Sequence, residues 1–200
     1  MRTVIFSTGP DIEAAHACRV HLGTLGVDAV VALDASSGGH LNAGEVLAAS
    51  DGPWMGDEGA VGMAETLLAQ AGGGPVARID ADTVFSADGI EWLAGAAGRT
   101  SRGYQIGYGN WCGAFSTTAE MLRRVLPTLR TARGNGCSGC VISFLLRKHG
   151  RFERASGVAH RWQEGRTIEP GCHLLTMPGG MPPLERAEAL RRLWELTPLH

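Results

Sequence analysis

Residues 75–84 read PVARIDADTV and place two aspartates, Asp80 and Asp82, directly after a short apolar run. The run over 76–80 predicts a core strand. Side chains two residues apart on a strand share a face, so both carboxylates are expected to converge at one edge of the sheet. In open α/β sheets, ligands bind at that edge. Carboxylate oxygens are hard ligands that suit Mg²⁺ or Mn²⁺, so the pattern predicts a divalent metal site.

Before this run, strand and helix patterns alternate along the chain. Residues 2–7, RTVIFS, predict a first strand, and residues 27–33, VDAVVAL, predict a second. Asp11 can cap a helix between them that runs to about Leu25. Another helix is expected over 60–71. This alternation predicts an α/β domain with a parallel sheet.

After Asp82 the pattern stays mixed. It predicts strands at 104–108, 112–116 and 152–158, and helices that follow a Thr117–Glu120 capping box, cover 141–149 and fill the C-terminal tail. Pro127 is expected to kink or shorten the first of these helices. The last helix has an apolar stripe of Leu184, Ala187, Leu190 and Trp194. We see no internal repeat and no dividing linker, so one domain over residues 1–200 is expected.

The composition excludes several classes of protein. The chain has 200 residues, of which 44% are apolar and 19% charged, a balance typical of globular rather than disordered proteins. The formal net charge of −2 provides no general attraction for nucleic acid. No apolar stretch approaches the length of a membrane span, and the N-terminal run is too short for a secretory signal, so a cytoplasmic location is expected.

The cysteines allow two interpretations. Their number, five, is odd, which favours reduced thiols. Cys137 and Cys140 form a C-x-x-C pair, and a zinc site that combines them with Cys172 and His173 is conceivable. A thioredoxin-like redox role requires such a motif to open a helix just after the first strand, whereas this pair lies late in the chain.

The order of these elements, with Arg78-Ile79-Asp80-Ala81-Asp82 at the end of a strand, resembles the GT-A nucleotide-sugar glycosyltransferases. In that family a helix precedes a strand that ends in D-x-D, which binds the metal and the sugar-diphosphate. The segment 109–116, GNWCGAFS, resembles the acceptor-side G-x-x-G segment of the family. The resemblance covers roughly residues 2–165 as an architecture. It implies a GT-A-like α/β fold with a mixed, mainly parallel sheet flanked by helices.

The resemblance also implies roles for individual residues. Asp82 would be the direct metal ligand, and Asp80 would share the metal or touch the ribose. A late histidine, His160 or, as a second choice, His173, would complete the metal site. The residues expected to bind the nucleotide-sugar are Ser7, Thr8, Asp34, Arg78, Asp80, Trp111 and Gly113. The implied cofactor is Mn²⁺ or Mg²⁺, and the implied donor is a nucleotide-sugar, with UDP-sugars favoured. Stacking by Trp111 and Trp162 and assistance from Arg161 or Arg166 are further expectations.

One departure from the family concerns the catalytic base. The family places an acidic pair where this chain has Ser138 and Gly139. An inverting mechanism needs a base near the acceptor hydroxyl, and Glu164 is the replacement that we expect. The alternatives are a retaining mechanism without such a base and a degenerate domain that only binds nucleotide-sugar. The acceptor stays open among a glycan, a protein, a small metabolite and a modified nucleic acid.

Two other enzyme classes share part of the pattern. Residues 80–84, DADTV, fit the opening motif of haloacid-dehalogenase-type phosphatases, with Asp80 as nucleophile. That motif normally lies on the first strand, and here Lys148 is the single lysine and no aspartate follows Asp88. Nucleotidyltransferases usually carry an early glycine-rich phosphate loop with a basic residue, which residues 7–10, STGP, lack.

Overall fold

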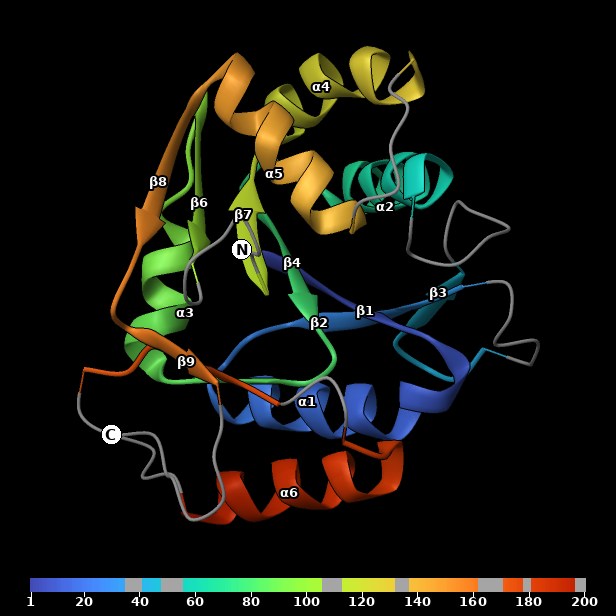
Figure 1. The fold of residues 1–200 in the computed structure, drawn as a ribbon, viewed down its shortest axis with the longest axis vertical. Coiled ribbons are helices and arrows are strands. Elements are labelled where there is room, and N and C mark those ends of the chain that lie inside the picture. The colour runs from blue at the N-terminus through green and yellow to red at the C-terminus, as the bar shows by residue number, and fades with distance from the viewer. Residues whose placement is uncertain are drawn as a thin grey trace.

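A seven-stranded sheet crosses the middle of the molecule (Figure 1). The computed structural model describes residues 1–34, 41–47, 56–105, 113–131, 137–161, 171–177 and 181–196. The strand order is β3-β2-β1-β4-β7-β6-β8. These strands are β1 (Arg2–Ser7), β2 (Ala29–Leu33), β3 (Glu45–Leu47), β4 (Val76–Asp80), β6 (Thr100–Tyr104), β7 (Ala114–Thr117) and β8 (Arg151–Ala155).

Most neighbouring strands in this sheet are parallel. β1 pairs in parallel with both β2 and β4, β2 with β3, and β6 with β8. β7 is antiparallel to β4 and to β6. In the register of β1 and β4, Phe6 lies opposite Asp80, so both strands end at the same edge. The expected mixed, mainly parallel α/β fold is confirmed.

Helices cover both faces of the sheet. Apolar side chains alternate along the strands, so each face has its own hydrophobic core. On one face, Val4, Phe6 and Phe115 pack against α2 (Gly56–Gln70), α4 (Ala119–Thr131) and α5 (Ser138–His149). On the other face, Ile5, Val31 and Ile79 pack against α1 (Ile12–Thr24) and α3 (Ala87–Ala94). Each fully buried aliphatic or aromatic side chain contributes about 2 kcal/mol of burial free energy, so the two cores account for most of the stabilisation of the fold.

A second, smaller sheet lies beside α1. The strands β5 (Thr83–Phe85), β10 (Leu174–Thr176) and β9 (Ala159–Arg161) form a three-stranded sheet in that order. The last helix, α6 (Pro183–Leu196), lies against α1, so that α1 is enclosed between the main sheet and α6 (Figure 1). Ala187, Leu190 and Leu193 of α6 contact Val84 and Leu175 of the small sheet. In the part of the chain that the structure describes, no helix has both the length and the apolarity needed to cross a membrane.

Several local predictions are confirmed, and others are wrong for identifiable reasons. The predicted strands at 2–7 and 76–80 match β1 and β4. Asp11 occupies the N-cap position of α1 without a capping hydrogen bond, because its carboxylate pairs instead with Arg186 at 2.8 Å. Of the strand expected at 104–108, Tyr104 is the last residue of β6, and residues 106–108 lie outside the described ranges.

The expected capping box is shifted by one position. Thr118, not Thr117, accepts a hydrogen bond from the backbone N–H of Met121, at 3.3 Å. Thr117 is buried in β7, where its hydroxyl lies 2.8 Å from that of Ser101. Pro127 lies inside α4, which continues to Thr131, so it does not shorten the helix.

Elements at the end of the chain also differ from expectation. Leu184, expected in the buried stripe of α6, is 77% exposed, while Ala187 and Leu190 are buried as predicted. α5 begins at Ser138 rather than Val141, so the C-x-x-C pair stands at its start. The strands β3, β5, β9 and β10 and the helix α3 were not anticipated. For α3 the available signal was Ser86, whose hydroxyl accepts from the N–H of Gly89 at 3.1 Å and caps the helix.

Candidate functional site

Four of the residues predicted to bind a nucleotide-sugar, Ser7, Thr8, Asp34 and Asp80, lie at the carboxyl edge of the main sheet. Ser7 ends β1, and Thr8 follows it directly. Asp34 follows β2 and is buried, and in the register of these two strands Ser7 lies opposite Leu33. Asp80 ends β4 next to Phe6 of β1. Parallel pairing therefore brings together residues from three segments that are far apart in the sequence.

The two aspartates reach this edge in a different way from the one expected. β4 ends at Asp80, and Ala81 and Asp82 form a turn into β5, so strand alternation does not extend to Asp82. The turn is fixed at both ends. Thr83 donates its hydroxyl to the carbonyl of Asp80 at 2.7 Å, and Met177 donates its N–H to the carbonyl of Asp82 at 3.0 Å. The carboxylates are still close enough that the charge of Asp82 raises the pKa of Asp80.

Arg78 binds Asp80 through two hydrogen bonds. One terminal nitrogen of the guanidinium donates to Oδ2 at 3.0 Å, and the other donates to Oδ1. The first nitrogen also donates to the carbonyl of Gly113 at 3.1 Å, and that carbonyl accepts the N–H of Asp80 as well. Arg78 is only 4% exposed. Strand alternation brings Arg78 and Asp80 to one face, so β4 carries its own counter-ion for the first aspartate.

Burial sets the electrostatics of both aspartates. Burial raises the pKa of Asp80 to about 7, against the opposing charge of Arg78. Burial also raises the pKa of Asp82, and the opposing charge that acts most on it is Arg186. Asp82 forms no salt bridge with any residue that the structure describes. Of the two carboxylates, Asp82 is therefore the one not already held by a cationic side chain.

Sequence reasoning missed Arg186. This residue lies on α6, and its side chain is 12% exposed where it binds Asp11. It also donates to the carbonyl of Met181 at 2.8 Å. Asp11 follows β1 and Arg186 is near the C-terminus, so only the packing of α6 on α1 brings this positive charge to the edge. The sequence carries no local signal for that approach.

Cys137 directly precedes Ser138 and Gly139, the positions where the resemblance placed an acidic pair. It occupies the N-cap position of α5. A hydrogen bond with Cys140 is the main cause that lowers the pKa of Cys137 to about 5, with help from Arg78 and from two backbone N–H groups, against the effect of burial. A side chain at Gly139 would place its Cβ 3.0 Å from the guanidinium carbon of Arg78, so the start of α5 lies directly against that arginine. The start of α5 therefore carries a thiol whose charge raises the pKa of Asp80.

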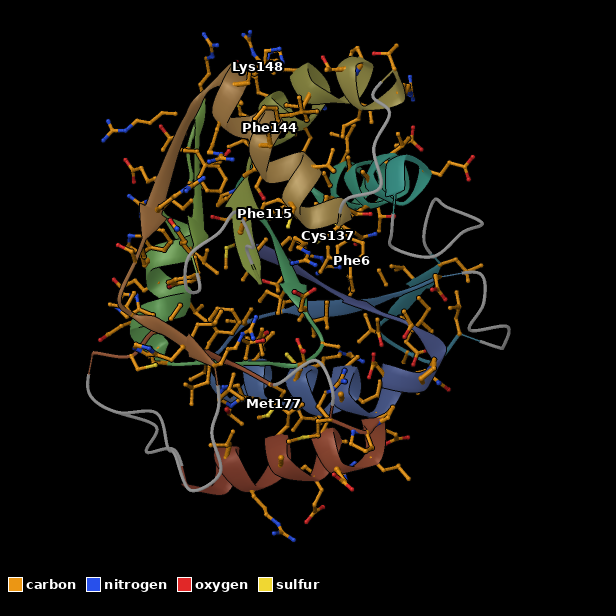
Figure 2. All side chains as sticks on the ribbon, in the orientation of Figure 1. Phe6, Phe115, Cys137, Phe144, Lys148 and Met177 are labelled. Carbon is orange, nitrogen blue, oxygen red and sulfur yellow. The ribbon has the colours of Figure 1, made fainter. Side chains whose placement is uncertain are left out.

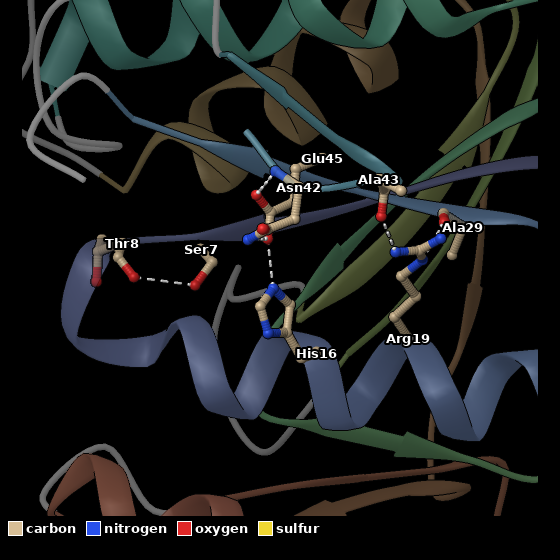
Figure 3. Close-up of polar contacts among 8 residues, drawn as sticks. All are labelled: Ser7, Thr8, His16, Arg19, Ala29, Asn42, Ala43 and Glu45. Carbon is tan, nitrogen blue, oxygen red and sulfur yellow. Dashed lines mark hydrogen bonds and ion pairs between the residues drawn. The ribbon is translucent and has the colours of Figure 1, made fainter. Parts of the chain in front are cut away.

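A second group of polar contacts fastens β3 to α1 (Figure 3). Nε2 of His16 lies 2.5 Å from Oε1 of Glu45, and Arg19 donates to the carbonyls of Ala29 and Ala43 at 3.1 and 2.7 Å. The hydroxyl of Ser7 donates a hydrogen bond to the carbonyl of Thr8, at 3.0 Å (Figure 3). A pocket of about 470 Å³ opens beside this group, and neither Asp80 nor Asp82 lines it. These contacts hold the sheet edge together and are separate from the D-x-D turn.

The histidines are not preassembled with the aspartates. His160 lies on β9 opposite Leu175 of β10. Nδ1 of His173 lies 3.2 Å from the hydroxyl of Tyr104, which gives this histidine a structural partner. Across the described ranges, no three His, Cys, Asp or Glu side chains are grouped closely enough to hold a metal ion. The zinc site conceived from Cys137, Cys140, Cys172 and His173 is therefore not formed, and His160 as a metal ligand stays a prediction.

Several predicted residues fall outside the described ranges. These are Trp111, Trp162, Glu164 and Arg166. Their expected roles in stacking, in assisting the leaving group and, for Glu164, as the catalytic base stay predictions. Gly113 is described, and its carbonyl accepts hydrogen bonds from both Arg78 and Asp80, while its role in binding the nucleotide-sugar stays a prediction.

No family model matches the sequence, and no curated protein sequence matches it significantly. Solved structures do resemble it. A protein described as a glucose-1-phosphate thymidylyltransferase from Bacillus anthracis aligns with a TM-score of 0.60 at 11% identity, over 96% of this chain and 95% of that chain. The galactosyltransferase LgtC, solved with donor and acceptor sugar analogues, aligns with a TM-score of 0.54 at 11% identity, over 98% and 96%. The inositol-1-phosphate CTP transferase from T. maritima aligns with a TM-score of 0.54 at 6% identity, over 97% and 96%. At such low identity the likeness is one of fold, and the fold is that of the GT-A glycosyltransferases and the nucleotidyltransferases.

Proposed function

We propose that this chain is a metal-dependent glycosyltransferase that moves a sugar from a nucleotide-sugar, with UDP-sugars favoured, to an acceptor. One observation carries the proposal. At the carboxyl edge of β4, Asp80 is held by Arg78, while Asp82 in the next turn has no salt-bridge partner among the described residues. A half-buried carboxylate without a salt-bridge partner is costly, and a divalent cation would supply such a partner.

The donor set fits Mn²⁺ or Mg²⁺. Such ions are commonly bound through one or two protein carboxylates together with the phosphates of the substrate. Asp82 is the direct ligand in this proposal. Asp80, whose two oxygens both accept from Arg78, contacts the ribose or shares the cation once Arg78 moves. His160 is the proposed third protein ligand.

The neighbouring strand ends would bind the nucleoside. Ser7, Thr8 and Asp34 stand at the ends of β1 and β2 beside Asp80, where open α/β sheets bind ligands. Gly113 adds a backbone surface next to Asp80 without a side chain that would fill the space. Arg78 keeps the carboxylate of Asp80 in a fixed orientation, which reduces the ordering cost of binding.

Transfer needs stabilisation of the departing nucleoside diphosphate. A bound divalent cation supplies positive charge to the diphosphate oxygens, which become more negative as the bond to the sugar breaks. Arg186, close to Asp82, adds positive charge from the protein. Glu164 is the proposed base that takes the proton of the acceptor hydroxyl.

A nucleotidyltransferase is the second candidate, because two of the similar folds reported above are nucleotidyl transferases. The turn after β1 counts against it. Residues 9–11 form a single 3₁₀ turn with Pro10 and Asp11 and contain no basic side chain for a triphosphate. A phosphatase that uses Asp80 as nucleophile is disfavoured, since both oxygens of Asp80 accept hydrogen bonds from Arg78.

The test is a thermal-shift panel of UDP-, GDP-, CMP- and dTDP-sugars, each with and without Mn²⁺, followed by an assay for release of the nucleoside phosphate. We expect metal-dependent stabilisation by at least one sugar nucleotide. Asp82→Asn should abolish it, and Asp88→Asn, an exposed aspartate on α3, should leave it intact.

The outcomes separate the candidates. Release of pyrophosphate from a nucleoside triphosphate and a sugar phosphate would support the nucleotidyltransferase instead. Metal-dependent binding without turnover, with or without acceptors, would support a degenerate binding domain. A panel with no metal-dependent shift would refute the proposal.

A further inference from the structure

The C-x-x-C pair opens a helix beside the D-x-D turn. Cys137 is the N-cap residue of α5, with φ −59° and ψ 129°, and Ser138 is the first helical residue. Figure 2 shows Cys137 where α5 begins, at the opposite end of the helix from Lys148. Both cysteines are free thiols and both are partly accessible. The pair thus meets the structural requirement of a helix-opening dithiol, although it lies late in the chain.

The two thiol groups of the pair interact. The thiol groups of Cys137 and Cys140 share a hydrogen bond. Residues three apart at the start of a helix have Cα atoms about 5 Å apart. A disulfide spans Cα separations of about 4.4–6.8 Å. A bond between the sulfurs therefore requires rotation of the side chains and no movement of the helix.

The surroundings favour a thiolate on Cys137 in particular. Its sulfur accepts hydrogen bonds from the backbone N–H groups of Gly139 and Cys140, which point out of the start of α5. Arg78 contributes positive charge, and Gly139 leaves room for its guanidinium. These contacts keep the pKa of Cys137 near 5, so the sulfur is ionised at neutral pH, when an ordinary thiol is mostly protonated.

The other described cysteines lack these features. Cys18 is fully buried, its thiol donates to the carbonyl of Thr83 at 3.4 Å, and burial raises its pKa. Cys172 is 7% exposed, and its thiol donates to the carbonyl of Leu174. Both serve as internal controls for reactivity.

We propose that Cys137 and Cys140 form a redox-active dithiol that exchanges with small-molecule disulfides. The Cys137 thiolate attacks one sulfur of a disulfide RSSR, forms a mixed disulfide and releases RS⁻. The Cys140 thiol then loses its proton and attacks the sulfur of Cys137, which forms the intrahelical disulfide and releases a second RS⁻. The proton from Cys140 converts one RS⁻ into RSH. The protein loses two electrons and RSSR gains them.

The exchange chemistry needs neither metal nor nucleotide, so it does not depend on the proposed function.

The test uses the full chain carrying Cys112→Ser, because Cys112 lies outside the described residues. The protein is equilibrated in glutathione buffers of different ratios, and the disulfide is located by peptide mass spectrometry. We expect one Cys137–Cys140 disulfide, with Cys18 and Cys172 unmodified. With Cys140→Ser added, a single glutathione should remain on Cys137. With Cys137→Ser, glutathione incorporation should fall at least tenfold, because the two N–H donors at the start of α5 activate Cys137 rather than Cys140.

A further measurement tests the reactivity of Cys137 separately from the proposed function. Alkylation of Cys137 in the reduced protein should fall to half its maximal rate near pH 5. A pair that stays reduced in oxidised glutathione, or that is protected by a retained metal ion, would overturn the exchange.

Discussion

Arg78 and Asp80, two residues apart on β4, form a two-point ion pair at the carboxyl end of the strand. The arginine side chain is 5% exposed and the aspartate side chain 21%, so most of the water around both charges has been removed. Each charge then depends on the other for compensation. The pair leaves Asp82 as the carboxylate without a salt-bridge partner among the described residues.

Removal of Arg78 should be strongly destabilising. Arg78→Met leaves the carboxylate of Asp80 largely buried without its counter-ion, and we expect a loss of about 3 kcal/mol in the free energy of unfolding, measured by urea denaturation. The control is Arg130→Met, which breaks an exposed pair with Glu65 and should cost less than about 1 kcal/mol. Equal losses in the two variants would show that the buried pair has no special importance.

Mn²⁺ binding should weaken as the pH falls. Burial raises the pKa of Asp80 to about 7 and raises that of Asp82, so protons compete with the cation where exposed carboxylates are fully ionised. The protonated form does not bind the metal, so affinity is greatest above the pKa and is lost as the pH falls through about 7. Isothermal titration with Mn²⁺ between about pH 8 and pH 6 measures this. An affinity that is constant over that range would contradict the assignment of these ligands.

His21 should make the protein sensitive to acid. This buried histidine lies 2.9 Å from the carbonyl of Phe85, and burial lowers its pKa below the ordinary value. The unfolded chain therefore binds a proton at a higher pH than the folded chain, so stability is lost as the pH falls below about 6.5. His21→Gln keeps a donor for Phe85 and has no titrating ring. Urea midpoints at about pH 7 and pH 5 should differ less in this variant than in the natural chain, and an identical difference would remove His21 as the cause.

Gly89 should be intolerant of any side chain. A Cβ at this position would lie 2.3 Å from the carbonyl oxygen of His173, a backbone atom that cannot move aside cheaply. We expect Gly89→Ala to cost about 1–3 kcal/mol, because it forces α3 away from the chain before β10. At Gly72, which follows α2, a Cβ would meet no atom within 4 Å, so Gly72→Ala should change stability by less than about 0.5 kcal/mol. Thermal unfolding of both variants compares them directly.

Local sequence patterns predicted a strand or helix wherever the segment is long enough to show the hydrophobic periodicity of that element. The strands β1 and β4 and the helix α1 were located from apolar runs and turn residues alone. The three-residue strands β3, β5, β9 and β10 are too short for any period to emerge, and their pairing depends on partners far away in the chain. The shift of the helix cap from Thr117 to Thr118 has a similar origin, since a buried hydrogen bond between Thr117 and Ser101 extends β7 by one residue.

The candidate site shows the same division. The sequence identified Asp80 and Asp82 and placed them at the end of a strand, because the alternation of apolar and polar residues is a local property. Strand alternation, which the sequence suggested as the reason for their convergence, is wrong, because Asp82 lies in a turn fixed by Thr83 and Met177. The position of the C-x-x-C pair late in the chain also argued against redox chemistry. Distance along the chain has no bearing on the field that Arg78 exerts on Cys137.

The sequence by itself determined the alternating strands and helices, the acidic turn after β4 and the reduced state expected for the cysteines. Only the tertiary structure decided that β7 enters antiparallel beside β4, that α6 brings Arg186 close to Asp82, and that α5 starts against Arg78. Periodicity and caps depend on residues a few positions apart and can be read from them. Pairing between distant segments depends on the complementary surfaces of whole elements, and these exist only once the chain has packed.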